Sequence, residues 1–207
     1  PAEGGARVRL SGKVQRLLSD LSEVVGNGEK AVVFSQHKAS LNHISHLLSL
    51  PARLPPALQA VKHVKIAKGD PQTSQEAAVG RFNSEPDVAV FLLHAGQGAA
   101  GLTLTKATHV FLLEPFFSPG EELQAMNRCH RIGQDRPVSC TVYYRPGTIE
   151  QRVLAHRRHD DQGQEREDSQ EGTDALSVLE AGTALQQVTK LRFLLGIAQT
   201  ARSADSN

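Results

Sequence analysis

Residues able to bind phosphate are concentrated between Gln124 and Gln134, where the chain reads Gln-Ala-Met-Asn-Arg-Cys-His-Arg-Ile-Gly-Gln. A helix is predicted from about residue 119 to its stop at residues 132–133, and it places Gln124, Arg128 and Arg131 at i, i+4 and i+7 on one face. A guanidinium is always charged, and its forked N–H donors match phosphate oxygens. Arg131, at the helix end, could therefore reach across a cleft as an arginine finger. The simpler alternative is an amphipathic helix whose last turn carries arginine to complement the helix dipole.

A glycine-rich segment, Gly96-Gln-Gly98-Ala-Ala-Gly101, follows an apolar run. Its G-x-G-x-x-G pattern, with Glu114 after the next apolar run, resembles the fingerprint of a dinucleotide-binding Rossmann unit. That unit needs a helix between its glycines and the second strand. Only residues 102–108 are available, and three of these seven are Thr, a poor helix former. The spacing therefore favours a loop whose bare amides approach a nucleotide or nucleic-acid phosphate.

The elements that must position these segments alternate between strands and helices. Buried strands are predicted from apolar or β-rich runs at residues 31–34, 61–66, 88–93, 110–113 and 138–144. Helices are predicted from apolar spacing and caps at residues 11–25, 39–50, 73–83 and 148–157, besides the arginine helix. Ser11 is the expected cap of the first, and Thr73-Ser-Gln-Glu76 is a capping box for the third. The alternation predicts an α/β fold with a parallel sheet covered on both faces.

Composition limits the classes of function. The formal net charge of the 207 residues is +1, so nucleic-acid binding would depend on local patches rather than a global basic field. The two cysteines, Cys129 and Cys140, lack paired spacing, which argues against a disulfide framework or a zinc site and suits a reducing compartment. No apolar run approaches the roughly 20 residues needed to span a bilayer. Without an initiator Met or a signal core, the chain looks like part of something longer.

Four regions are expected: a flexible end at 1–10, a folded lobe at 11–158, a polar linker at 159–173 and a C-terminal helix at 174–201. The linker is predicted because large apolar residues disappear there, and the helix because they return at helical spacing. Lys62, Lys65 and Lys68 could contact a DNA backbone, but exposed edge strands also favour lysine.

The order of the motifs resembles the second RecA-like lobe of the Swi/Snf-type branch of superfamily-two helicases, the ATP-driven DNA translocases. The resemblance is carried by Ser11-Gly-Lys13, Ala31–Gln36, Gly69-Asp70 with Thr73–Glu76 and Arg81–Asn83, Val90–Thr105, Gln124–Gln134 and Gly147–Arg152. Departures from the broad family at His94-Ala95-Gly96, Thr103 and Glu114-Pro115 look most like the SHPRH branch. That branch also carries a RING ubiquitin-ligase module, for which two cysteines are too few.

The resemblance implies a RecA-like (P-loop NTPase-type) parallel sheet with helices on both faces and a C-terminal helical appendage. It makes Arg131 the finger and Arg128 a second phosphate contact, with no metal ligand in the chain. Further contacts on the nucleotide side would come from Gln124, Gly98, Gly101 and Gln134. Contacts to nucleic acid would come from Ser35, Gln36, His37, Lys38, Thr103 and Thr105.

The implied cofactor is ATP with Mg²⁺, held mainly by a first lobe, because this chain has no G-x-x-x-x-G-K-[ST] and no acidic metal motif. The chain alone is therefore expected to be inactive, although its parent would be a DNA-dependent ATPase in the nucleus. Expected partners are that first lobe and duplex DNA bound without sequence preference, with nucleosomes or ubiquitin machinery reached through the parent and no membrane. The alternatives are a degenerate lobe kept for docking and, more remotely, the dinucleotide unit.

Overall fold

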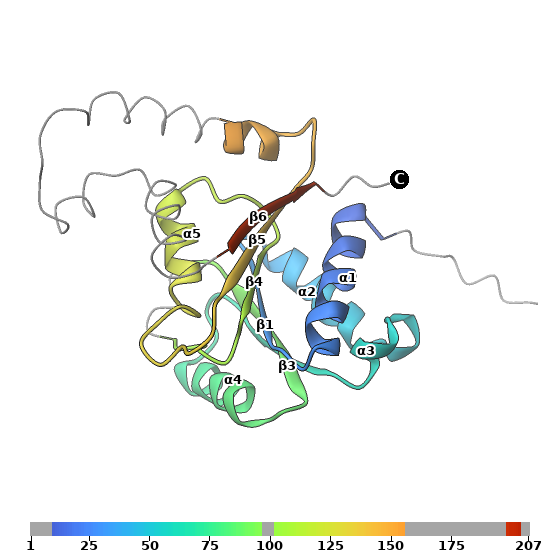
Figure 1. Cartoon of the computed structure of the whole chain (residues 1–207), viewed down its shortest axis with the longest axis vertical. Helices are drawn as coiled ribbons and strands as arrows, with labels where there is room; N and C mark the ends of the chain where they lie inside the picture. Colours follow the sequence, from blue (N-terminus) through green and yellow to red (C-terminus); the bar gives the residue numbers. More distant parts are fainter. Residues whose placement is uncertain (1–9, 97–101, 156–197, 204–207) are drawn as a thin grey trace, which may run out of the picture.

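A parallel β-sheet forms the centre of the computed structural model, which describes residues 10–96, 102–155 and, for the backbone, 198–203 (Figure 1). The strands are β1 (Ala31–Ser35), β2 (Lys62–Ile66), β3 (Val88–His94), β4 (His109–Leu112), β5 (Ser139–Tyr144) and β6 (Ala198–Ser203). The helices are α1 (Gly12–Gly26), α2 (Lys38–Leu48), the 3-10 turn η1 (Pro51–Arg53), α3 (Pro56–Gln59), α4 (Gln72–Ser84) and α5 (Pro119–Met126). Residues 149–155 are also helical. The strands predicted from apolar runs are thereby confirmed.

The strand order is β2-β3-β1-β4-β5-β6, and every neighbouring pair is parallel. β1 lies between β3 and β4, with Val33 opposite both Leu92 and Phe111. Because parallel strands all end at one edge, the loops after β1, β3 and β4 begin side by side. Polar segments far apart in the sequence are thus brought together at the centre of the sheet.

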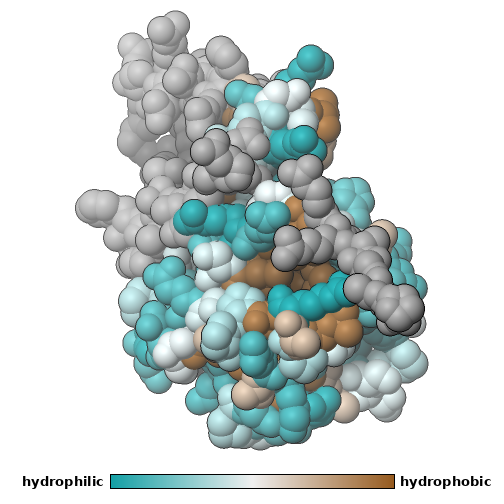
Figure 2. Space-filling view, turned by 90° about the vertical axis from the view of Figure 1, so that its right-hand side faces the viewer, coloured by the Kyte–Doolittle hydropathy of each residue, from teal (hydrophilic) through white to brown (hydrophobic). Residues whose placement is uncertain are grey.

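Successive residues of each strand enter two different cores. Val32 and Phe34 pack on the face covered by α4 and α5, whereas Ala31 and Val33 pack on the face covered by α1, α2 and α3 (Figure 1). Burial on both faces explains why the strands read as unbroken apolar runs. The face of the molecule drawn in Figure 2 is mostly hydrophilic, with hydrophobic residues gathered near its centre.

Helix α1 is tied to the sheet and to the end of the lobe. The predicted cap is confirmed, since the Ser11 hydroxyl accepts the Val14 N–H at 3.4 Å. From the buried side of the helix, Asp20 accepts the Tyr143 hydroxyl of β5 at 2.5 Å. Lys13 forms an ion pair of 2.5 Å with Glu150 in the helical segment 149–155.

The predicted capping box at the start of α4 is wrong. The helix begins at Gln72 with Pro71 in the cap position, no side chain caps it, and Thr73 is exposed inside the first turn. Proline favours the start of a helix because its φ is already fixed and it has no N–H to satisfy. The carboxylate of Asp70, which precedes Pro71, accepts the Ala67 N–H at 2.7 Å and does not cap the helix.

At the C-terminal end, residues 198–201 lie in β6 rather than at the end of the predicted helix 174–201. β6 pairs along its whole length with β5, so backbone hydrogen bonding to a neighbouring strand outweighs the local apolar pattern. The rest of that predicted helix, the linker 159–173 and most of the end 1–10 lie outside the described residues.

Candidate functional site

Helix α5 is shorter than predicted, and both arginines lie beyond it. The helix ends at Met126, after which the N–H groups of Arg128 and Cys129 bond back three residues in tight turns. Gln124 is on the helix and exposed, whereas Arg128 and Arg131 follow its end, so the three residues do not share one helical face. Beyond the helix, Arg128 O accepts the Leu104 N–H at 2.9 Å instead of an N–H of a further helical turn. Residues 127–134 therefore form a loop, called here the arginine loop.

The arginine loop is fastened to the segment between β3 and β4. Arg131 Nη1 donates to Thr103 Oγ1 at 3.2 Å. The Gln134 side chain donates to the carbonyls of Thr105 at 2.9 Å and Ala107 at 2.8 Å. The structure thus joins Arg131 and Gln134 to residues 103–107 through loop contacts rather than through helix spacing.

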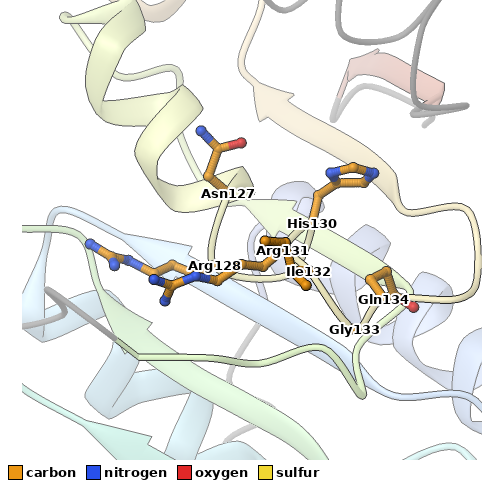
Figure 3. Close-up of a pocket in the computed structure, with 7 residues that line it drawn as sticks. All are labelled: Asn127, Arg128, His130, Arg131, Ile132, Gly133 and Gln134. Atoms are coloured by element: carbon orange, nitrogen blue, oxygen red, sulfur yellow. The ribbon is translucent and has the colours of Figure 1, made fainter.

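The guanidiniums of Arg128 and Arg131 point the same way from the loop, whereas Gln134 points away from them (Figure 3). Burial, and then the charge of Arg131, lower the pKa of Arg128. Within residues 10–96 and 102–155, the Arg128 side chain forms no hydrogen bond or ion pair. Two positive side chains lie side by side, and no carboxylate neutralises Arg128. Such a surface is suited to bind an anion.

An open hollow of about 650 Å³ lies over this loop. Its lining consists of Asn127, Arg128, His130, Arg131, Ile132, Gly133 and Gln134 (Figure 3). Ile132 is fully exposed at the tip of the loop, and Gly133 adopts a φ of +97° that a residue with a Cβ rarely adopts. Gln124 does not line the hollow, and Gly98 and Gly101 lie outside the described residues.

The loop after β1 is built around the carboxylate of Glu114, which was not among the predicted site residues. The Ser35 hydroxyl donates to Glu114 Oε1 at 2.9 Å, and the Gln36 N–H donates to the same oxygen at 2.5 Å. The His37 N–H in turn donates to Ser35 Oγ at 3.0 Å. Burial raises the pKa of Glu114, and the hydrogen bonds from Gln36 and Ser35 oppose that shift only in part. An acidic residue directly after a buried strand was the available signal for this role.

This network corrects two expectations. Ser35 is fully buried, so it shapes the loop and has no surface to offer a nucleic acid, whereas His37 and Lys38 are exposed at the start of α2. The dinucleotide alternative is also wrong, because residues 102–108 contain no helix and the Glu114 carboxylate is already occupied. Of the lysines near β2, Lys62 pairs with Asp87 at 2.7 Å, which favours their edge-strand interpretation.

Within the part of the chain that the structure describes, no cluster of three or more His, Cys, Asp or Glu side chains is placed to hold a metal ion. None of the helices in that part of the chain is both long and apolar enough to cross a membrane.

Residues 12–133, more than half of the chain, match the helicase conserved C-terminal domain. The chain belongs to that family. It is similar, at 35% identity over 147 residues, to an uncharacterized ATP-dependent helicase of Schizosaccharomyces pombe, covering 70% of this chain and 13% of that protein. It is similar at 33% to the DNA repair protein rad8 of the same yeast, covering 69% of this chain and 12% of rad8.

A third relative is the Caenorhabditis elegans homolog of a SWI/SNF-related regulator of chromatin containing DEAD/H box 1, with 31% identity over 70% of this chain and 14% of the relative. The chain thus spans only about an eighth of the length of these relatives. Its fold is that of the crystal structure of the C-terminal part of the Fun30 ATPase domain, with a TM-score of 0.62 at 24% identity over 69% of this chain and 44% of that one. The RecA-like sheet is therefore confirmed, and the narrower resemblance to the SHPRH branch stays a prediction.

Proposed function

We propose that this helicase C-terminal domain is the second lobe of a Swi/Snf-type, ATP-driven DNA translocase and that it delivers Arg131 to a nucleotide held by the first lobe. The observation that carries the proposal is the pair of parallel guanidiniums on a fastened loop, with Arg128 lacking any protein partner among the described residues. ATP and Mg²⁺ would be held mainly by the first lobe, as in related phosphoryl-transfer enzymes.

The chemistry required of Arg131 is electrostatic. During transfer of the terminal phosphoryl group, negative charge redistributes over oxygens that water would otherwise solvate. A guanidinium that reaches them only when the lobes close stabilises the transition state more than the bound substrate. The bond from Arg131 to Thr103 limits the rotamers of a long side chain before closure. Arg128 would contribute a second charge to the same anion.

Duplex DNA is proposed to contact the loops at the carboxyl edge of the sheet and the neighbouring segment from Thr103. His37 and Lys38 are exposed there, and Thr103 presents a hydroxyl beside Arg131. Such side chains contact phosphate and fix a protein on the duplex without reading its sequence. Ser35, with the half-buried Gln36, would hold the loop in shape through Glu114.

The decisive experiment is replacement of Arg131 in the full-length protein. Arg131→Ala should lower DNA-stimulated ATP turnover by about 10³- to 10⁵-fold, as loss of an arginine finger does. Arg131→Lys should be nearly as damaging, because an ammonium keeps the charge but loses the fork. The melting temperature and the DNA affinity without nucleotide should be unchanged, since Arg131 is exposed.

Arg81→Ala is the matched control, because Arg81 is an exposed arginine on α4 that pairs with Glu85 at 3.0 Å. It should leave turnover unchanged. If Arg131→Ala retains turnover within a few-fold of wild type, the finger assignment is wrong, and Arg128→Ala becomes the test. A full-length protein with no ATP turnover would instead favour a degenerate lobe kept for docking.

We further propose that the full-length protein acts on DNA in the nucleus, in chromatin remodelling or repair. Support comes from relatives named as a regulator of chromatin and a DNA repair protein. Imaging of the tagged full-length protein tests this, and exclusion from the nucleus would contradict it. Nucleosome and ubiquitin-machinery partners stay predictions of the resemblance.

A further inference from the structure

The side chain of Gln134 contacts three separate stretches of backbone. Its Nε2 donates to the carbonyls of Thr105 at 2.9 Å, Ala107 at 2.8 Å and Cys129 at 3.3 Å. Its Oε1 accepts the Arg136 N–H at 3.1 Å. One carboxamide therefore joins both ends of the arginine loop to the segment that leads into β4.

Two more bonds connect the same segments. Leu104 N–H donates to Arg128 O, and Thr103 Oγ1 accepts from Arg131 Nη1. Residues 103–107 and 128–134 are thus one hydrogen-bonded unit, and Gln134 supplies its bonds on the side away from the guanidiniums (Figure 3). The exposed Arg131 side chain can be no better placed than the backbone that carries it, and a misplacement of about 1 Å can lower a rate about 10²-fold.

We infer that Gln134 is a positioning residue: it clamps the arginine loop to residues 105–107 so that Arg131 is presented correctly, and it does not bind the nucleotide itself. This inference rests on the proposed function of Arg131. It replaces the expectation that Gln134 is a nucleotide contact, because the two amide hydrogens are already shared among three carbonyl oxygens. No donor is left on Gln134 for a phosphate.

Two substitutions of Gln134 break its side-chain hydrogen bonds and so test the clamp. Gln134→Glu keeps the length but turns a carboxylate oxygen toward the three carbonyls, which repels them. Gln134→Met keeps a similar length without adding charge, and it removes both the amide donor and the oxygen that accepts the Arg136 N–H. Neither substitution removes a positive charge or a proposed DNA contact. The matched control is Gln59→Glu, since Gln59 Nε2 also donates to a carbonyl, that of Leu54 at 3.0 Å, but on the opposite face of the sheet.

The first measurement follows the thiol of Cys129 and needs no nucleotide. Cys129 is fully buried in the arginine loop, and burial raises its pKa, so it should resist alkylation in the wild-type chain. Release of the clamp should expose it. We expect Cys129 to be labelled at least about tenfold faster in both Gln134 variants. Cys140, buried in β5, should stay protected there, as should both thiols in Gln59→Glu, with sites assigned by mass spectrometry.

The second measurement is ATP turnover by the full-length protein. Both Gln134 variants should lower kcat about 10²-fold while the KM for ATP and the DNA affinity stay at wild-type values, because the nucleotide is held elsewhere. An unchanged kcat would overturn the inference, as would a Cys129 that stays protected. A raised KM for ATP with unchanged kcat would also overturn it, because Gln134 would then be a ligand. A wild-type protein with no turnover would overturn the proposed function, and the positioning role with it, whatever the thiol shows.

Discussion

Glu114 illustrates how one residue can be structural and electrostatic at once. It accepts hydrogen bonds from Ser35 and Gln36, so it fixes the loop that we propose contacts DNA. It is also nearly buried, at 7% relative exposure, and that burial disfavours its ionised form. The loop is therefore held by a carboxylate that folding makes harder to ionise.

This raised pKa predicts a pH dependence of stability. The folded state binds the proton of Glu114 more tightly than the unfolded state does. Protonated Glu114 therefore stabilises the fold fully below the ordinary pKa of 4.5, and this stabilisation is lost as pH rises through the raised pKa. Relative to Glu114→Gln, the wild-type chain should therefore gain stability as pH falls from neutral toward 4.5. Melting temperatures of both proteins across that range measure the difference. A constant difference, or one moving the other way, would show that the hydrogen bonds dominate.

At the scale of elements, the two helix starts make a matched pair. The Ser11 hydroxyl caps α1, whereas Thr73, predicted to cap α4, lies within the helix and its side chain caps nothing. Ser11→Ala should therefore lower the free energy of unfolding by about 1 kcal/mol. Thr73→Ala should change it by less than about 0.5 kcal/mol. Chemical denaturation measures both free energies of unfolding. An equal decrease for Thr73→Ala and Ser11→Ala would show that Thr73 does cap α4.

The sequence was sufficient where local pattern decides structure. Unbroken apolar runs predicted β1, β3 and β4 because a strand buried on both faces must be apolar throughout. The loop that follows α5 could not be predicted, since Arg128 O is bonded to the N–H of Leu104, 24 residues away in the sequence. The clamp formed by Gln134 could not be predicted either, because it depends on carbonyls distant in the sequence. Residue types at the site were therefore predictable, but the backbone holding them depended on distant pairing.

At the scale of the whole molecule, a net charge of +1 means that any DNA contact is local. The chain should bind duplex DNA weakly and without sequence preference, with affinity falling as salt rises. Lys38→Gln should weaken binding and reduce the slope of log affinity against log salt by about 1. Lys62→Gln should do neither, because Lys62 is paired with Asp87 on the β2 edge.

Fluorescence titrations of the two variants at several salt concentrations measure those slopes. Equal slopes in wild type and Lys38→Gln would show that the loop after β1 does not face the duplex. Strong preference for one DNA sequence would contradict backbone contact altogether.

The alternation of strand residues between two cores has a consequence for how such a lobe can evolve. Val33 and Phe34 are neighbours in the chain, yet they belong to separate clusters on opposite sides of the sheet. Substitutions in the two clusters should be close to additive, since they share no packing partners. The buried residues packed under α1, α2 and α3 can therefore change in sequence while the arginine side keeps its geometry. A lobe built in this way can exchange the residues of one core without disturbing the loop that carries its two arginines.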